Sequence, residues 1–214
     1  MQKLEAISNA VATGKIGETK ELVRRAVEEG IDAMQIINGG LASGLEVVGA
    51  RFKSGEMFLA EMMMSAVAAK AGIEIATEKF KKGEYKPKAT MVLGTVKGDL
   101  HDIGKNLVAL VLRSSGFEVI DLGVDVREDD FINAVKKYNP AFLGISCLMT
   151  TTMQNMKDSI DALAEAGLRD TIKVVIGGCS VNQDFASQIG ADGYARNAVD
   201  AIDLMERLLA KIKN

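Results

Sequence analysis

The 214-residue chain contains no tryptophan, only two prolines and two cysteines, and a single histidine. It has no long hydrophobic run, since the longest mainly apolar stretch, Met62 to Ala69, ends at Lys70, well short of the roughly 20 residues that a membrane span needs. The first residues mix charged and apolar side chains and lack the apolar core of a secretion signal. We therefore expect a cytoplasmic protein without membrane association.

The scarcity of cysteine and histidine limits the chemistry of the chain. Cys147 and Cys179 form neither a C-x-x-C pair nor a dense disulfide framework, so both are expected to be reduced, buried thiols. Any reaction that needs an imidazole has only His101. The formal net charge of -3 argues against a nucleic-acid partner. The 48% hydrophobic and 26% charged residues are typical of a packed protein and exclude low-complexity disorder.

The first part of the chain, residues 1–86, has the apolar spacing of helices with short connections. The sequence from Asn38 to Gly40 is expected to interrupt the third helix. A helix rich in Met and Ala is expected from about Phe58 to Phe80, followed by a linker from Lys81 to Lys88. These features predict a compact antiparallel bundle of four or five helices.

The second part, residues 87–214, alternates between short apolar runs and helical patterns. The predicted strands are Ala89 to Thr95, Glu118 to Leu122, Ala141 to Ser146, Ile172 to Ile176 and Gly193 to Ala195. The predicted helices are Lys105 to Ser115, Glu128 to Tyr138, Thr151 to Ala166, Asn182 to Ile189 and Ala198 to Lys211. This alternation predicts a doubly wound parallel sheet, a Rossmann-like (flavodoxin-like) α/β fold. Ligands of such sheets bind beyond the carboxyl ends of the strands, where the strand order reverses.

The loop after the first predicted strand contains the only histidine. Asp99 and His101 lie two residues apart, and a neighbouring carboxylate fixes the tautomer of a metal-binding imidazole and raises its basicity. Gly98 and Gly104 lack a Cβ on either side of the pair, so the backbone can approach a flat or bulky group. The alternative is a surface histidine in a helix-capping loop, with Asp99 or Asp102 bonded to helix N–H groups.

Two further loops fall at the same edge of the predicted sheet. The third strand ends in the S-x-L sequence Ser146 to Leu148 and is followed by several threonines, and the fourth ends in Gly177 and Gly178. Taken alone, these segments are best explained by ordinary helix capping and a tight turn.

Together, D-x-H-x-x-G, S-x-L and G-G in this order resemble the signature of the corrinoid (cobalamin, vitamin B12) binding domain of methionine synthases and corrinoid methyl-carrier proteins. The resemblance implies that His101 replaces the dimethylbenzimidazole base as the lower axial ligand of cobalt, the base-off/His-on arrangement. It also implies a nucleotide tail that runs past small residues in the sheet. The implied cofactor-binding residues are Gly98, Asp99, Leu100, His101, Asp102, Ile103, Gly104, Ser146, Leu148, Thr150, Thr152, Gly177, Gly178, Tyr194 and Ala198.

The resemblance further implies a hydrogen-bonded relay from His101 through Asp99 to a hydroxyl group. The matching position in this chain is Thr152, where the methionine synthase pattern has serine. Protonation of such a relay would weaken the bond between histidine and cobalt.

The helical part resembles the cap domain of the same family over the segment from Gly44 to Met62. Phe52, Leu59 and Met62 match the positions that cover the methyl group on the upper face of the corrin. Ala60 replaces the proline often found after Phe-Leu. Without the downstream motif, these residues would be interpreted as ordinary bundle core.

The resemblance implies a carrier of a methyl group on cobalt, without catalytic activity of its own. The expected partners are a substrate-specific methyltransferase, an acceptor methyltransferase that uses tetrahydrofolate or coenzyme M, and a reductive activase for Co(II). An alternative is a subunit of an adenosylcobalamin-dependent mutase, although such subunits lack the bundle. Others are a corrinoid sensor, which usually needs a further domain, and a receiver or nucleotide module without cobalt, which leaves the joint motif unexplained.

Overall fold

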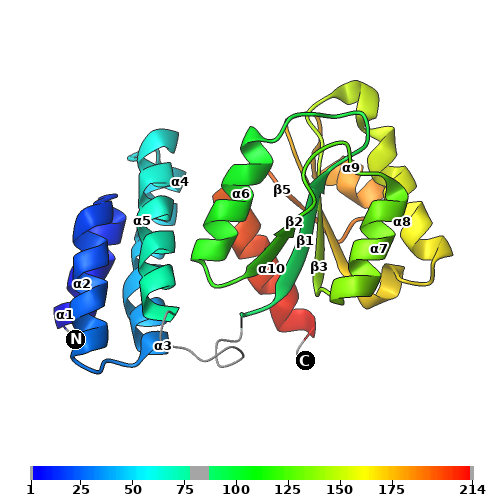
Figure 1. Cartoon of the computed structure of the whole chain (residues 1–214). Coiled ribbons are helices and arrows are strands. Elements are labelled where there is room, and N and C mark those ends of the chain that lie inside the picture. The colour runs from blue at the N-terminus through cyan, green and yellow to red at the C-terminus, as the bar shows by residue number, and fades with distance from the viewer. Residues whose placement is uncertain (1, 78–86, 213–214) are drawn as a thin grey trace. The chain divides into compact units, whose positions relative to one another are not determined.

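The computed structural model describes residues 2–77 and 87–212 (Figure 1). The chain forms two compact units, one comprising Met1–Pro87 with Arg113–Gly116 and the other Lys88–Leu112 with Phe117–Asn214. The predicted C-terminal end of the Met- and Ala-rich helix, at Phe80, lies outside the described residues, as does most of the predicted linker.

The first unit is helical, as predicted. Its elements are α1 (Gln2–Ala12), α2 (Ile16–Glu28), α3 (Ala33–Ile36), the π-helical segment η1 (Ile37–Ala42), α4 (Ser43–Ser54) and α5 (Leu59–Thr77). Helix α2 packs along α5, and α1 packs against α2, η1 and α4. The buried side chains of Ile7, Val11, Val23, Ile36 and Leu41 meet in its core.

The expected interruption at Asn38 to Gly40 is wrong, because the chain stays helical there and widens into the π-helical segment η1. The glycines serve close packing against α1. A Cβ on Gly40 would lie 3.0 Å from Cγ2 of Ile7, and one on Gly44 would lie 2.7 Å from the carbonyl oxygen of Ser8. Local sequence suggested a helix break, whereas tertiary packing requires residues without side chains.

The second unit contains a five-stranded parallel sheet in the order β2-β1-β3-β4-β5. Its strands are β1 (Thr90–Thr95), β2 (Glu118–Asp121), β3 (Phe142–Ser146), β4 (Lys173–Gly177) and β5 (Gly193–Ala195). Its helices are α6 (Ile103–Ser114), α7 (Glu128–Tyr138), the 3-10 segment η2 (Thr150–Thr152), α8 (Gln154–Glu165), the 3-10 segment η3 (Arg169–Thr171), α9 (Gln183–Gln188) and α10 (Ala198–Ile212). The predicted doubly wound α/β fold is confirmed.

Side chains alternate between the two faces of the sheet, as the pleat of a strand requires. On β1, Met91 and Leu93 pack against α6 and α10, whereas Val92 packs on the opposite face against α7 and α8. Both faces are therefore covered by helices, which explains the nearly continuous apolar sequence of the strands.

The carboxyl ends of four strands lie in register. Thr95 pairs with Ser146, Ser146 with Gly177, and Gly177 with Ala195. The loops that leave these residues consequently begin at one edge of the sheet. Within residues 2–77 and 87–212, none of the helices combines the length and apolar character needed to cross a membrane.

Candidate functional site

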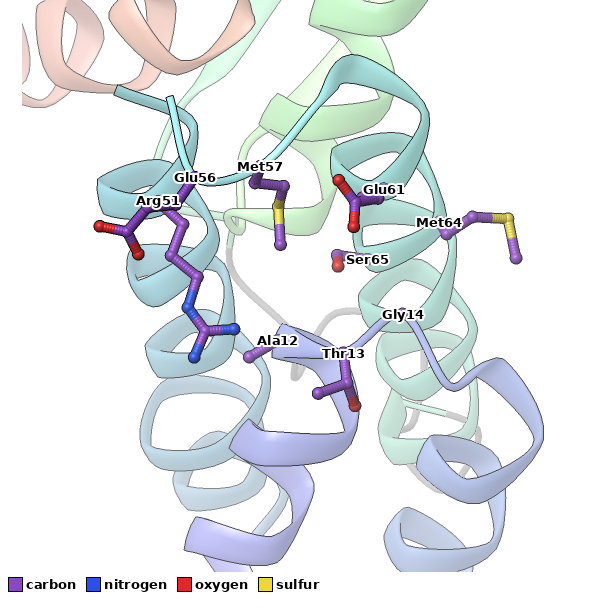
Figure 2. Close-up of a pocket in the computed structure, with 9 residues that line it drawn as sticks. All are labelled: Ala12, Thr13, Gly14, Arg51, Glu56, Met57, Glu61, Met64 and Ser65. Atoms are coloured by element: carbon purple, nitrogen blue, oxygen red, sulfur yellow. The ribbon is translucent and has the colours of Figure 1, made fainter. Parts of the chain in front are cut away.

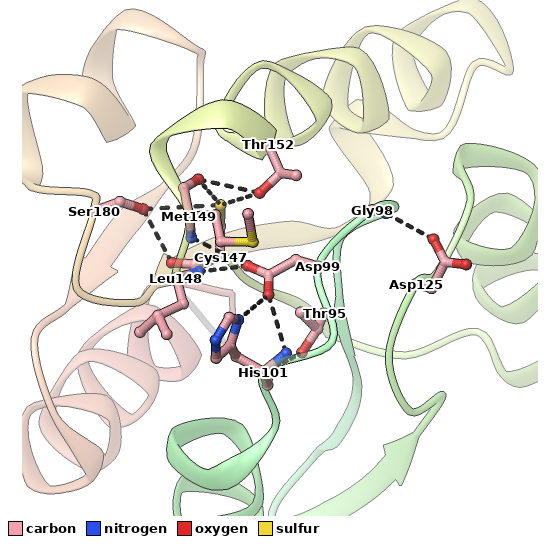
Figure 3. A network of polar contacts seen from close by, with 10 residues as sticks. All are labelled: Thr95, Gly98, Asp99, His101, Asp125, Cys147, Leu148, Met149, Thr152 and Ser180. Carbon is pink, nitrogen blue, oxygen red and sulfur yellow. Dashed lines mark hydrogen bonds and ion pairs between the residues drawn. The ribbon is translucent and has the colours of Figure 1, made fainter.

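The three loops singled out in the sequence meet where the strand order reverses. Strand β1 lies between β2 and β3, so the loop after β1 faces the loop after β3, and the loop after β4 lies beside them (Figure 3). This is the edge at which ligands of doubly wound sheets bind. The D-x-H-x-x-G, S-x-L and G-G segments are therefore brought together as expected.

Asp99 is at the centre of this edge, and its residue is 0% exposed. One carboxylate oxygen, Oδ1, accepts the backbone N–H of His101 at 3.0 Å and lies 2.7 Å from Nδ1 of the same residue. The other, Oδ2, accepts the backbone N–H groups of Leu148 at 2.7 Å and Met149 at 3.3 Å. One buried carboxylate thus joins the loop after β1 to the loop after β3.

These contacts keep Asp99 ionised at neutral pH. Burial by itself raises the pKa of the carboxyl group, but the backbone hydrogen bonds from His101 and Leu148, with smaller effects from the His101 ring and Met149, outweigh it. The pKa of Asp99 consequently lies below its ordinary value. An acceptor-only carboxylate therefore faces Nδ1 of the imidazole.

His101 presents its second ring nitrogen outward. Because Nδ1 donates to the ionised Asp99, the neutral imidazole has its lone pair on Nε2, the atom available to a metal. The side chain is 54% exposed. Its backbone is also fixed, since the buried Thr95 donates a hydrogen bond from Oγ1 to the carbonyl oxygen of His101 at 3.0 Å.

Exposed apolar side chains flank the imidazole. Leu100 and Ile103 are 71% and 84% exposed, and Leu148 and Met149 are each 39% exposed. Large exposed apolar side chains gathered on adjacent loops are typical of a binding surface. Gly104 has open space at its Cβ position, where no atom of another described segment lies within 4 Å.

Gly178 marks a second close approach. Its φ of 127° is one that L side chains rarely adopt, and a Cβ there would lie 1.8 Å from the carbonyl oxygen of Cys147. A Cβ on Gly177 would lie 3.1 Å from the carbonyl oxygen of Ala195. The G-G segment therefore runs directly against the S-x-L segment, which leaves no room for a larger residue at Gly178.

The predicted relay stops at Asp99. Thr152 is buried nearby, but its Oγ1 donates to the carbonyl oxygen of Met149 at 3.1 Å and lies 3.2 Å from Sγ of Cys147. Between the described residues Asp99 and Thr152 there is no hydrogen bond, because backbone N–H groups already occupy Oδ2 of Asp99. The sequence shows that a hydroxyl is present but not which acceptor it faces.

The remaining predicted residues lie around the same edge or just beyond it. Ser146 ends β3, Thr150 begins η2 and is exposed, and Ala198 is buried at the start of α10. Asp102 accepts a hydrogen bond from the side-chain Nδ2 of Asn106 at 3.0 Å, which differs from the contact with a backbone N–H in the helix-capping alternative. Tyr194 lies on β5, where burial raises the pKa of its phenol.

The expectation for the cysteines is half right. Cys147, the middle residue of the S-x-L segment, is buried, and its carbonyl oxygen accepts a hydrogen bond from Oγ of Ser180 at 3.2 Å. Cys179 is exposed, because the tight turn at Gly178 directs the chain away from the core. The expectation that both thiols are buried is therefore wrong for Cys179.

The three predicted cap residues all lie in the helical unit. Phe52 is half-buried near the end of α4, Leu59 is exposed at the start of α5, and Met62 is buried one turn later. The same end of the bundle contains a hollow of about 580 Å³ (Figure 2). The buried hydroxyl of Ser65 lines it and has no hydrogen-bond partner in the described part of the chain. Water or a small polar group can satisfy this hydroxyl.

Asp125 was not singled out in the sequence, although it contacts the central loop. Its Oδ1 accepts the backbone N–H of Gly98 at 2.7 Å (Figure 3). No local sequence signal identifies such a residue, since the contact joins loops from two different strands.

The donor set fits a corrinoid. A single imidazole nitrogen is oriented by a buried carboxylate, apolar side chains flank it, and glycine provides close backbone approach. Among the described residues, no group of three or more His, Cys, Asp or Glu side chains could hold a bare metal ion. The oriented imidazole of His101 suits a metal held in a macrocycle that needs one protein ligand.

Comparisons with known proteins agree with this geometry. Residues 89–203 match a family model described as B12 binding domain, and residues 3–77 match a second model with the same description. The chain is 42% identical over 216 residues to a corrinoid protein of Desulfitobacterium hafniense, with 99% of each chain covered. It is also 42% identical over 211 residues to dimethylamine corrinoid protein 1 of Methanosarcina acetivorans, with 97% of each covered.

A solved structure extends the agreement to three dimensions. The methanol:cobalamin methyltransferase complex of Methanosarcina barkeri contains a chain that matches with a TM-score of 0.86 at 38% identity, covering 98% of this chain and 80% of that one. The family resemblance inferred from the motifs is confirmed. Fold, site geometry and sequence similarity together show that the chain belongs to the B12-binding family of corrinoid proteins.

Proposed function

We propose that the protein carries a methyl group on the cobalt of a bound corrinoid, between a substrate-specific methyltransferase and a second methyltransferase. The observation that carries this proposal is the pair of buried Asp99 and outward-facing His101 at the carboxyl edge of the sheet. Its relatives include a dimethylamine corrinoid protein and a chain of a methanol:cobalamin methyltransferase complex, which supports a role in such a system.

When bound, the corrinoid supplies a cobalt ion that accepts and releases a methyl group. His101 would bind that cobalt through Nε2, in the base-off/His-on arrangement. Asp99 holds the ring by Nδ1 and raises the basicity of Nε2. The N–H groups of Leu148 and Met149 in turn hold Asp99, so the ligand is oriented before the cofactor arrives.

The remaining site residues receive roles by the same proposal. Ser146 and Gly177 end β3 and β4, and Gly178 follows Gly177, at the edge where the nucleotide tail would run. Gly178 would serve the tail indirectly, because it lets the loop after β4 lie against the backbone of Cys147. The apolar side chains of Leu100, Ile103 and Leu148 would contact the corrin ring and its edge. Asp102, Gly98, Gly104, Thr150, Thr152, Tyr194 and Ala198 complete the proposed surroundings of the cofactor.

We assign the two halves of the chain to separate tasks. Residues 87–214 would bind the corrinoid, and residues 1–86 would form a cap whose Phe52, Leu59 and Met62 protect the methyl group. The cap has to move away for each partner, as lids do in other enzyme systems.

The protein would act only with partners. A substrate-specific methyltransferase delivers the methyl group, and an acceptor methyltransferase passes it to tetrahydrofolate or coenzyme M. A reductive activase would restore cofactor oxidised to Co(II). We place this system in the cytoplasm, where the thiols of Cys147 and Cys179 stay reduced.

The first test is loading of the full chain with cobalamin. We expect one equivalent of cobalt per chain after gel filtration, because the chain offers one imidazole. The loaded protein should then take up a methyl group when reduced and mixed with dimethylamine or methanol and the matching methyltransferase, followed by cofactor absorbance. A chain that retains no cobalamin, or loaded protein that accepts no methyl group from any such pair, would contradict the proposal.

A further inference from the structure

Asp125 has a backbone conformation that aspartate adopts at some cost. In the described parts of the chain, Asp125 and Asn139 are the residues other than glycine with positive φ, at 53° and 44°. Asn139 caps the end of α7, a usual place for this conformation. Asp125 instead lies in the loop between β2 and α7, and such unfavourable conformations persist where surrounding contacts require them.

The contacts of Asp125 bracket Asp99. Oδ1 of Asp125 accepts the backbone N–H of Gly98 at 2.7 Å, and its own backbone N–H donates to the carbonyl oxygen of Asp99 at 3.1 Å. Gly98 has a φ of 79° and thus forms a left-handed turn just before Asp99. Asp125 therefore holds the turn at Gly98 through its side chain (Figure 3). It also holds the main chain of Asp99 through its backbone N–H.

Neighbouring hydrogen bonds give the β2–α7 loop a fixed position. The N–H of Thr95 donates to the carbonyl oxygen of Gly123 at 3.0 Å, and the N–H of Val126 donates to the carbonyl oxygen of Thr95 at 2.9 Å. Val126 is buried, whereas Asp125 is exposed. Asp125 consequently contributes little to the core, and its carboxylate has a specific task in the loop after β1.

We propose that Asp125 is a positioning residue for the Asp99–His101 pair, which it orients by holding the left-handed turn at Gly98. The side chain of Asp99 has to face Nδ1 of His101 and two backbone N–H groups at once, so a loose turn would misdirect the imidazole. The consequence for cobalt ligation rests on the function proposed above. The hold on Gly98 does not depend on it.

Three substitutions separate the carboxylate from the backbone conformation. Asp125→Asn keeps an oxygen acceptor and tolerates positive φ, Asp125→Gly accepts this φ without an acceptor, and Asp125→Ala lacks both. In the full chain, amide exchange of Gly98 should be about tenfold faster in the Gly and Ala variants, the equivalent of one lost hydrogen bond. In Asp125→Asn it should stay near the wild-type rate.

The cofactor provides the second readout. Asp125→Gly should bind cobalamin about tenfold more weakly and show less histidine coordination in its visible spectrum, as loss of a residue that orients a ligand does. Asp125→Asn should resemble wild type in both respects. Asn139→Gly, which removes a side chain at the other position with positive φ, serves as the matched control and should change neither readout.

Each outcome decides between two claims. If Asp125→Gly equals wild type in Gly98 exchange and in cobalamin binding, the backbone conformation alone matters and the inference is wrong. If wild-type protein shows no histidine coordination, the proposed function fails, while Gly98 exchange still tests the hold of Asp125. Faster exchange at Gly98 with unchanged histidine coordination would overturn the positioning role.

Discussion

Asp99→Asn weakens the binding of cobalamin by about 10- to 100-fold, the usual effect of removing a residue that orients a metal ligand. The variant has almost the same shape but only one oxygen acceptor. In the native protein, the two carboxylate oxygens serve Nδ1 of His101 and three backbone N–H groups. The N–H₂ group of the asparagine must therefore face hydrogen-bond donors, either those of His101 or the backbone N–H groups of Leu148 and Met149.

Stability should fall together with affinity. A buried N–H group left without an acceptor costs about 1–3 kcal/mol, and Leu148 or His101 would lose theirs. The measurements are titration with cobalamin followed by visible absorbance and urea unfolding of the full chain. Asp184→Asn, at an exposed position on α9, is the matched control and should behave as wild type. Equal cobalamin affinity in Asp99→Asn and wild type would contradict the role of Asp99.

Gly178→Ala should reduce the free energy of unfolding by at least about 3 kcal/mol, because unfavourable backbone conformation and overlap both contribute. The added methyl group would lie 1.8 Å from the carbonyl oxygen and 2.7 Å from the carbonyl carbon of Cys147, at a φ of 127°. The backbone of Cys147 cannot move aside as the end of a flexible side chain can. The loop after β3 or the loop after β4 has to move.

Gly167→Ala isolates the contribution of the overlap. Gly167 also has a positive φ, 70°, but nothing lies within 4 Å of its Cβ position. This control should cost only about 1–2 kcal/mol, the penalty for a left-handed L residue. Urea unfolding of both variants provides the comparison. Equal losses would show that the approach of Gly178 to Cys147 is unimportant for stability.

The sequence predicts the second unit well for physical reasons. Strands covered on both faces are apolar throughout, so β1 and β3 are visible as short runs, and parallel strands place the residues that follow them at one edge. The register of Thr95, Ser146 and Gly177 then follows from the fold. The meeting of the three loops at one edge of the sheet could therefore be predicted from the sequence.

The details that failed depend on contacts between distant segments. Gly40 and Gly44 indicate a break when only local sequence is considered, but they allow close packing against α1. Thr152 has the expected hydroxyl, but it donates to the carbonyl oxygen of Met149. Oδ2 of Asp99 instead accepts the backbone N–H of Leu148. Asp125 acts across two loops, which no pattern within either loop reveals.

The central claim is that His101 binds cobalt, and the single histidine makes it directly testable. In protein grown with ¹⁵N-labelled histidine and loaded with cobalamin, His101 alone carries labelled imidazole nitrogens. Electron paramagnetic resonance of the Co(II) form shows whether an axial nitrogen splits the cobalt lines. We expect that the three-line splitting from ¹⁴N in unlabelled protein becomes a two-line splitting from ¹⁵N. A three-line splitting that persists after labelling would identify the cofactor's own base as the ligand and contradict ligation by His101.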